Sequence, residues 1–289
     1  MNSSTEAPVK FVWLSGDLVP ESNARVSALD RGFLYGDGLF ETMRVWRGRI
    51  PFWDRHAARL TEGLRLLRFK DRPDATGLQR RADELLRRNA VEEGVFRLQV
   101  TRGVGARGYS PRDAGGSTVL MSTHPLPRPV AGGLSCWRVV TAGVRVWSGS
   151  PLNRVKSTSK VLQVLARAEA DDQGADEALL LNERGDLVEA SGANLFWVHG
   201  GKLLTPSLEA GALPGVTRAE ILRLARGLGL AVAEISAGPE ALHQAEGVFL
   251  TNSVWGVVAV GELDGHRLPS CGWVARLWSA WLESLATGG

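Results

Sequence analysis

The sequence is poor in lysine, tyrosine, cysteine and histidine. Only five of its 34 basic residues are lysine (Lys10, Lys70, Lys156, Lys160 and Lys202), and its 289 residues include two tyrosines, two cysteines and five histidines. Two distant cysteines exclude a disulfide framework, and the cysteines and histidines lack the spacing of zinc ligands. The small number of lysines also leaves few candidates for lysine chemistry.

Long apolar runs and a strong net charge are missing as well. No stretch of about 18 apolar residues is present, which excludes a transmembrane helix, and the first ten residues do not resemble a signal peptide. The net charge is +3, and the densest arginine group, over 80–88, is interspersed with acidic residues. This pattern indicates a mixed-sign helix face. We expect a soluble, cytoplasmic protein with no structural metal, no nucleic-acid partner and no membrane partner.

The composition itself is globular, with 44% hydrophobic and 22% charged residues, and the length allows one large or two modest domains. Periodicity predicts strands at 11–14, 41–50, 95–102 and 117–122 and helices over 52–69 and 76–91. Three prolines and two glycines then interrupt regular structure in 124–133. We therefore expect a smaller N-terminal α/β domain (1–124), a linker (125–133) and a larger C-terminal domain (134–289).

The second half mixes helices with hairpins. Helices are predicted over 158–171, 217–228 and 272–285, and hairpins over 177–191 and 194–206. This mixture favours an α+β (mixed α/β) fold over a doubly wound parallel sheet. A dinucleotide fingerprint is absent, because no helical pattern follows the Gly-rich segment at 103–108.

Lys156 and Glu189 are the first candidates for chemistry. Lys156 lies where a loop of small polar residues leads into the predicted helix, and the positive end of the helix dipole there favours the neutral amine that Schiff-base chemistry requires. A solvated surface lysine is the alternative, and Lys160 competes one turn further on. Glu189 precedes the small residues 190–193, which leave room for a flat group whose protonated ring nitrogen a carboxylate can hold. A strand-end glutamate facing water is the alternative.

Three further segments have the composition of binding sites. Gly215 leads a helix that carries Thr217 and Glu220 at capping-box spacing, and such a helix start binds anions, unless it is an ordinary capped helix. The segment FLTNSVWG at 249–256 is a small polar turn after an apolar strand and suits the rim of a pocket. Two Gly-rich loops, at 34–42 and 101–109, contain both tyrosines of the chain, Tyr35 and Tyr109. Arg102 and Arg107 in the second loop are suited to bind a carboxylate, unless these loops are merely flexible and solvated.

Taken in order, these segments resemble the fold-type IV family of pyridoxal-phosphate enzymes, which contains branched-chain aminotransferases, D-amino acid aminotransferases and 4-amino-4-deoxychorismate lyases. The resemblance runs from about residue 12 to 260. It implies a homodimer of two-domain subunits with a fold like that of D-amino acid aminotransferase. It also implies pyridoxal 5'-phosphate as the cofactor.

The resemblance assigns roles to individual residues. Lys156 matches the lysine that binds the cofactor covalently and moves protons, Arg59 the arginine that grips its phosphate, and Glu189 the carboxylate paired with its pyridine nitrogen. Four more cofactor-binding residues are implied at the predicted helix start and the polar turn: Val216, Thr217, Asn252 and Ser253.

Within the family, two segments are more similar to the lyases than to the aminotransferases: RGVGARGYS at 102–110 and FLTNSVWGVVAV at 249–260. Val161 stands where branched-chain enzymes have a tyrosine, whereas Glu41 occupies a position that is threonine in some lyases. The resemblance thus implies an aminodeoxychorismate lyase that forms 4-aminobenzoate and pyruvate in folate biosynthesis. Its small substrate, carrying carboxylate and amine groups, would contact four residues of the Gly-rich loops: Tyr35, Arg102, Arg107 and Tyr109.

Two alternatives remain open. The first is a class IV aminotransferase that acts on D-amino acids, branched-chain amino acids or amines with a 2-oxo acid acceptor. The second is a non-catalytic binding protein that keeps the same fold.

Overall fold

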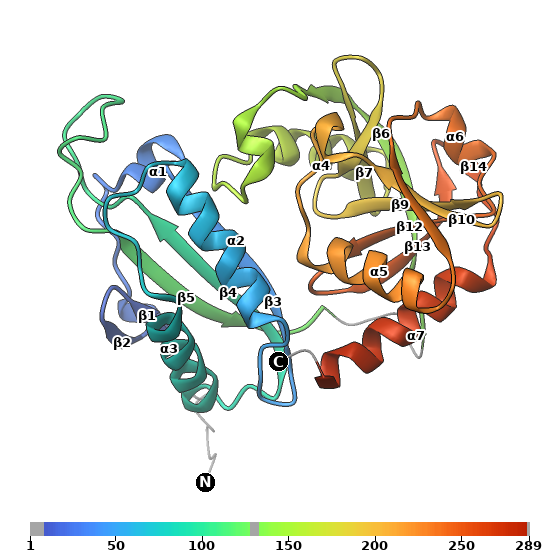
Figure 1. The fold of residues 1–289 in the computed structure, drawn as a ribbon. Helices are drawn as coiled ribbons and strands as arrows, with labels where there is room; N and C mark the ends of the chain where they lie inside the picture. Colours follow the sequence, from blue (N-terminus) through green and yellow to red (C-terminus); the bar gives the residue numbers. More distant parts are fainter. Residues whose placement is uncertain (1–8, 128–132, 288–289) are drawn as a thin grey trace, which may run out of the picture. The chain divides into compact units, whose positions relative to one another are not determined.

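The structure, a computed structural model, describes residues 9–127 and 133–287. The chain forms two compact units. The first contains the chain up to Trp53, Ala57–Leu126 and Ser157–Ser159, and the second contains Asp54–His56, Pro127–Lys156 and the chain from Lys160 onward. Most of the expected linker lies outside the described residues, because 128–132 are not among them. Each unit combines a sheet with helices (Figure 1), which confirms the mixed α/β prediction.

A five-stranded antiparallel sheet forms the base of the first unit. Its order is β2(Asp17–Pro20)-β1(Phe11–Leu14)-β5(Thr118–His124)-β4(Glu93–Thr101)-β3(Gly38–Trp46). On β4, Phe96 and Leu98 are buried while Arg97 between them is half-exposed, as expected for a sheet with one covered face. The covering helices are α2(Trp53–Leu66), where Trp53 meets Phe96 edge-on, and α3(Ala75–Arg88), which packs on β1 and β5 (Figure 1).

A short helix, α1(Arg31–Tyr35), precedes β3 and was not expected from the sequence. The Asp30 side chain caps it by accepting a hydrogen bond from the Gly32 amide at 2.7 Å. Gly36 ends it with a φ of 65°, in the left-handed region that favours glycine. Five residues are too few to produce a visible apolar period, so sequence patterning missed this helix.

The second unit contains a mixed nine-stranded sheet. Its main path runs β11(Ala231–Ile235)-β10(Lys202–Pro206)-β9(Asn194–His199)-β12(Gly247–Asn252)-β13(Gly256–Leu263)-β6(Cys136–Val146)-β7(Glu177–Asn182)-β8(Leu187–Ala190), and β14(His266–Arg267) pairs with β13. The β7–β8 and β9–β10 pairs are the predicted antiparallel hairpins. Parallel pairing of β6 with β7 and β13, and of β10 with β11, makes the sheet mixed.

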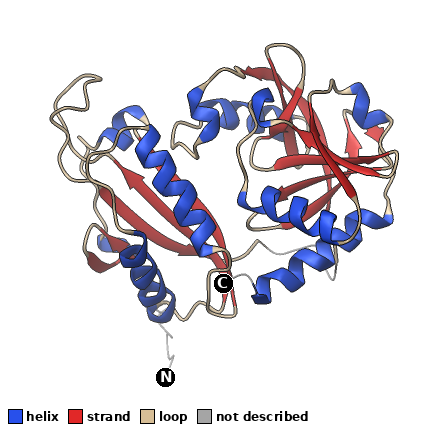
Figure 2. Ribbon diagram, in the orientation of Figure 1, coloured by secondary structure: helices blue, strands red, loops and turns tan. Residues whose placement is uncertain are grey.

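Strand β7 shows where the core of this unit lies, because it is buried on both faces. Leu179 and Leu181 join the cluster that includes Trp197 and residues of α6(Glu240–His243) and the turn after it, whereas Ala178 and Leu180 face α4(Val161–Asp172). Two further helices, α5(Val216–Gly227) and α7(Gly272–Thr287), pack on each other and on β12 or β13 (Figure 2). None of the described helices combines the length and hydropathy needed to cross a bilayer.

Helix α4 begins at Val161, three residues later than predicted. The preceding polar residues are engaged elsewhere: Ser157 forms a bridge with Leu39, and Thr158 donates from its amide to Gly38 O (2.9 Å) and from its hydroxyl to Gly36 O (2.8 Å). These hydrogen bonds compete with helix formation. The placement of Lys156 at the helix start is therefore wrong, because Lys156 lies four residues before the N-cap residue, Lys160.

Candidate active site

The start of α5 has the features of an anion site. The helix follows Gly215, and among the described residues no side chain caps it and no acidic residue stands in its first turn. Its first backbone N–H groups and its dipole thus favour a negative group. Val216 and Thr217, the predicted phosphate contacts, are its first two residues and are buried.

The capping box expected from Thr217 and Glu220 does not form. The helix begins at Val216, so Thr217 lies inside it and its hydroxyl instead lies 3.2 Å from the Ser253 hydroxyl. Glu220 is buried and accepts from Arg55 at 2.7 Å and from Arg223 at 2.6 Å. Burial raises the pKa of Glu220, but the hydrogen bonds and charges of Arg223 and Arg55 hold it below its ordinary value of 4.5.

The turn after β12 brings Ser253 to this helix start. The Asn252 carboxamide oxygen accepts from the amides of Val254 (3.1 Å) and Trp255 (2.9 Å), which closes the turn. Asn252 thus shapes the turn, while Ser253 contacts Thr217 and lies 3.4 Å from Nε2 of the buried His56. Sequence reasoning missed His56, although its place three residues before Arg59 on a predicted helix was visible.

Glu189 is the last residue but one of β8 and is half-buried, and one of its carboxylate oxygens accepts from two donors. That oxygen accepts from the Leu213 amide at 2.9 Å and from the Asn194 carboxamide at 3.1 Å. Asn194 also donates to Leu213 O at 2.9 Å. The segment that leads into α5 therefore fixes Glu189 as well, and it connects the anion site with the carboxylate.

The backbone at Gly215 lies directly against the side chain of Asn194. A Cβ atom at this position would lie 2.0 Å from the Asn194 carboxamide oxygen, so any larger residue would displace Asn194. Lys156 belongs to the same unit and lies half-buried after the short 3-10 helix Pro151–Arg154. The structure thus gathers in one unit the predicted residues Lys156, Glu189, Val216, Thr217, Asn252 and Ser253.

Arg59 belongs to the first unit and forms a two-pronged ion pair with Glu41. Arg59 Nε donates to Oε1 at 2.8 Å and Nη2 to Oε2 at 2.5 Å. Glu41 is buried on the core-facing side of β3 beside Leu39 and Met43, where a carboxylate requires such a partner. The sequence did not indicate this pairing. Contact between Arg59 and a phosphate stays a prediction.

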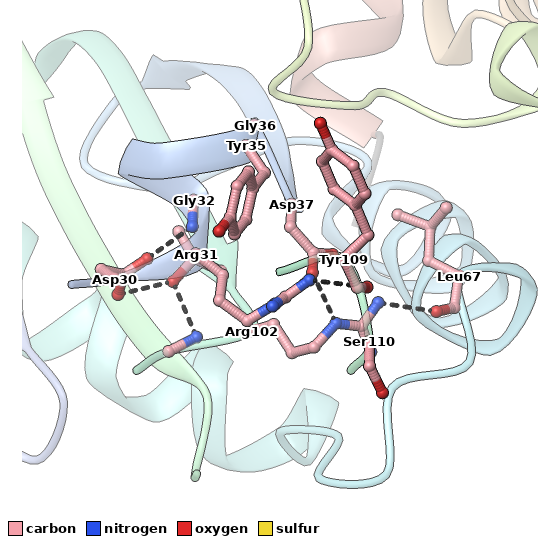
Figure 3. Close-up of polar contacts among 12 residues, drawn as sticks. Asp30, Arg31, Gly32, Tyr35, Gly36, Asp37, Leu67, Arg102, Tyr109 and Ser110 are labelled. Atoms are coloured by element: carbon pink, nitrogen blue, oxygen red, sulfur yellow. Dashed lines mark hydrogen bonds and ion pairs between the residues drawn. The ribbon is translucent and has the colours of Figure 1, made fainter. Parts of the chain in front are cut away.

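The four predicted substrate contacts also lie in the first unit, but they differ in how many hydrogen bonds their side chains already make within that unit. The nitrogens of the buried Arg102 donate to Asp37 and to Leu67 O, both at 2.8 Å (Figure 3). They also donate to Arg68 O at 3.2 Å, and the guanidinium lies over the Phe69 ring. Its donors are thus directed into the unit, which argues against a direct role in binding substrate. Arg107 is exposed and has no hydrogen-bond or ion-pair partner among the described residues.

Tyr35 and Tyr109 meet edge-on with ring centroids 5.6 Å apart. The Tyr35 hydroxyl accepts from the Gly108 amide at 3.1 Å, and the Tyr109 side chain is largely exposed. Asp37, between two glycines, accepts from both Arg31 and Arg102 (Figure 3). Burial raises the pKa of Asp37, but the hydrogen bonds and charges of Arg102 and Arg31 keep it below its ordinary value of 3.8.

A helix start suited to an anion, a fixed carboxylate and a lysine in one mixed α/β unit are the features expected of the pyridoxal-phosphate enzymes of fold type IV. A sequence model of the family described as amino-transferase class IV matches residues 38–263. The chain therefore belongs to the class IV aminotransferase family, as the sequence resemblance predicted.

Two curated relatives and one solved structure illustrate the range of the family. A provisionally named branched-chain-amino-acid aminotransferase of Methanocaldococcus jannaschii is 36% identical over 256 residues, 88% of each chain. An aminodeoxychorismate lyase of Vibrio harveyi is 30% identical and covers 87% of this chain and 91% of its own. The branched-chain aminotransferase of Thermoproteus uzoniensis, solved with norvaline, has a TM-score of 0.90 and 27% identity, covering 96% of this chain and 96% of that one.

The cofactor of the family is pyridoxal 5'-phosphate, and another solved branched-chain aminotransferase of this fold contains pyridoxamine 5'-phosphate. The residues of this chain fit the cofactor. The start of α5, with its N–H groups and the hydroxyls of Thr217 and Ser253, suits a phosphate. Glu189 suits a protonated ring nitrogen, and a half-buried lysine completes the set. Among the described residues, no group of three or more histidine, cysteine or acidic side chains is arranged to hold a metal ion.

Proposed function

We propose that the chain is an aminodeoxychorismate lyase, which converts 4-amino-4-deoxychorismate into 4-aminobenzoate and pyruvate in folate biosynthesis. The observation that carries this proposal is the turn after β12. This turn belongs to the segment that is more similar to the lyases, and Asn252 of that segment closes the turn with two hydrogen bonds. That turn presents Ser253 to Thr217 at the anion site. Similarity to the Vibrio harveyi lyase supports the same function.

Seven residues would hold the cofactor in this proposal: Arg59, Lys156, Glu189, Val216, Thr217, Asn252 and Ser253. Thr217, Ser253 and Arg59 would bind the phosphate, and Asn252 would act through the shape of the turn. Glu189, fixed by Asn194 and the Leu213 amide, would keep the pyridine nitrogen protonated. When bound, the cofactor supplies an electron sink next to the substrate amine.

Lys156 would move the protons of the reaction. Its amine would remove the proton from the ring carbon that carries the amino group, and the carbon–oxygen bond to the neighbouring enolpyruvyl group would then break. The enolpyruvate takes up one proton and becomes pyruvate, so atoms balance without water or an oxidant. The remaining ring is aromatic, which makes the elimination strongly favourable.

Substrate carboxylates would be bound by the loop over 102–110. Arg107 is exposed and able to form a two-pronged contact with a carboxylate, Tyr109 belongs to the same loop, and Tyr35 packs against it. Arg102 would act indirectly, since its donors hold Asp37 and the carbonyls of Leu67 and Arg68.

An aminotransferase is the second candidate, and the 36% identity to the Methanocaldococcus jannaschii protein favours it. The same lysine, carboxylate and phosphate contacts would serve both reactions. The difference lies in where the proton returns and in whether a 2-oxo acid leaves as the product.

We further propose that the domains run over 1–124 and 134–289 and that two chains form a homodimer. Light scattering of the purified protein tests the homodimer.

Paired assays decide between the two reactions. In the first, the holoenzyme receives 4-amino-4-deoxychorismate, and 4-aminobenzoate and pyruvate are measured. In the second, it receives D-alanine, leucine or an amine with 2-oxoglutarate or pyruvate. The lyase proposal expects turnover in the first assay, and turnover only in the second would overturn it.

A further inference from the structure

The side chain of Arg31 makes two polar contacts to the loop over 103–110. Arg31 is the first residue of α1 and its exposed fraction is 3%. Its Nη1 donates to Gly108 O at 2.8 Å. Its Nη2 donates to Tyr109 O at 3.1 Å (Figure 3). One buried guanidinium therefore holds two consecutive carbonyls of the loop.

The same turn is held a second time by Tyr35, four residues further along α1. The Tyr35 hydroxyl accepts from the Gly108 amide at 3.1 Å, and the Arg31 guanidinium lies 4.9 Å from the Tyr35 ring centroid. Gly108 has a φ of 105°, a conformation that residues with a side chain rarely adopt. Three backbone groups at 108–109, the Gly108 amide and the two carbonyls, are thus hydrogen-bonded to side chains of α1.

Asp37 anchors the guanidinium that holds the loop. One of its oxygens accepts from Arg31 Nε at 2.9 Å and from Arg102 Nε at 2.8 Å. Asp37 lies between Gly36, with a φ of 65°, and Gly38, where a Cβ would lie 2.7 Å from Val100 O. The tight backbone here places the carboxylate between the two arginines, and its negative charge offsets the cost of burying them.

The ordered backbone presents two largely exposed side chains. Tyr109 is 87% exposed, and its ring extends away from the guanidinium groups (Figure 3). Arg107 is exposed as well and has no partner among the described residues. An aromatic ring and a cation on an ordered backbone lose little further entropy on binding, which is typical of a preorganised recognition site.

We propose that Arg31 is a positioning residue that orders this loop and so sets the affinity for the substrate carboxylates bound by Arg107 and Tyr109. The inference rests on the proposed substrate-binding role of the loop. Arg31 itself does not touch substrate, and its effect is expected in KM rather than in kcat.

The test compares the holoenzymes of Arg31→Ala and Arg31→Lys with Arg72→Ala, which removes an exposed arginine that has no partner among the described residues. In Arg31→Ala we expect a KM for 4-amino-4-deoxychorismate at least about tenfold higher, a kcat within about threefold and an unchanged visible cofactor spectrum. Amide hydrogen exchange over 103–110 should become faster. Arg31→Lys should restore part of the affinity, and Arg72→Ala should match the unsubstituted enzyme.

A double variant shows whether Arg31 acts through Arg107. We expect Arg31→Ala with Arg107→Ala to raise KM by less than the product of the two single effects, because Arg31 acts in part through Arg107. Fully additive effects, or unchanged loop exchange in Arg31→Ala, would overturn the inference. If only amino acids are turned over, the lyase proposal fails, and the same KM comparison with the accepted amino acid still decides the role of Arg31.

Discussion

Lys156 and Lys160 are four residues apart, but the structure places them differently. Lys156 is half-buried directly before a segment that pairs with β3, and Lys160 is the N-cap residue of α4. Spacing alone left both as candidates, and the family pattern favours Lys156. The position of the helix start separates them, because only Lys160 belongs to the helix terminus.

We expect Lys156→Ala to lower turnover by about 10³-fold or more, since it removes the group that moves the protons. Circular dichroism should stay unchanged. The matched control is Lys160→Ala, which should retain most of the activity. Borohydride reduction of the holoenzyme followed by peptide mapping should modify the peptide that contains Lys156, and modification of Lys160 instead would reverse the assignment.

Several buried charges were not predictable one residue at a time. Glu41 lies on the buried face of β3 among apolar residues, and its ion pair with Arg59 offsets the cost of burying the carboxylate. Asp37 and Arg31 each pair with residues remote in sequence, such as Arg102 and the loop carbonyls. No local period marks such partners.

At the scale of elements, α5 connects the anion site with Glu189. Its start was predicted within one residue, because the turn at Pro214–Gly215 and the apolar spacing after it are local signals. The bond between Asn194 and Glu189 was not predicted, because it depends on how β8, β9 and the segment before α5 meet.

The close approach at Gly215 predicts that Gly215→Ala weakens cofactor binding by about tenfold or more. The added methyl would collide with Asn194 and thereby disturb Glu189. Gly227→Ala at the other end of the same helix is the control, since its Cβ meets open space and should leave binding unchanged. Titration of the apoproteins with pyridoxal phosphate measures both, and equal affinities would contradict this account of Glu189.

The ion pairs of Glu220 on α5 predict that this residue contributes to the stability of the fold. Glu220→Gln should lower the free energy of unfolding by about 2 kcal/mol, because the buried side chain loses charge-assisted bonds to Arg55 and Arg223. The control Glu62→Gln breaks an exposed pair with Arg65 and should cause no measurable change. Urea unfolding curves measure both, and equal midpoints for the two variants would argue against the Glu220 network.

At the scale of the whole molecule, each unit contains a carboxylate whose pKa is lowered by two arginines: Asp37 in the first and Glu220 in the second. A carboxyl group with a lowered folded-state pKa contributes stability above its ordinary pKa. That stability is lost as the pH falls through the folded-state value.

We therefore expect the free energy of unfolding to fall as the pH drops below about 4.5, the ordinary value for Glu220, and further below 3.8, the ordinary value for Asp37. Thermal unfolding followed across this range measures the effect. In a variant with both Asp37→Asn and Glu220→Gln the acid dependence should be weaker. A pH profile with an unchanged slope in that variant would contradict the assignment.

The sequence by itself determined the types and order of most elements, the mixed α/β class and the family. Apolar periodicity, Gly–Pro turns and short motifs are local properties, so α2, α5 and the two hairpins could be read without a structure. Only the tertiary structure decided which charges are paired, where α4 begins and which arginine of the loop is available. Arg102 and Arg107 carry the same group five residues apart, but the fold directs the first onto Asp37 and leaves the second exposed. Those outcomes depend on hydrogen bonds between distant segments, which no local pattern records.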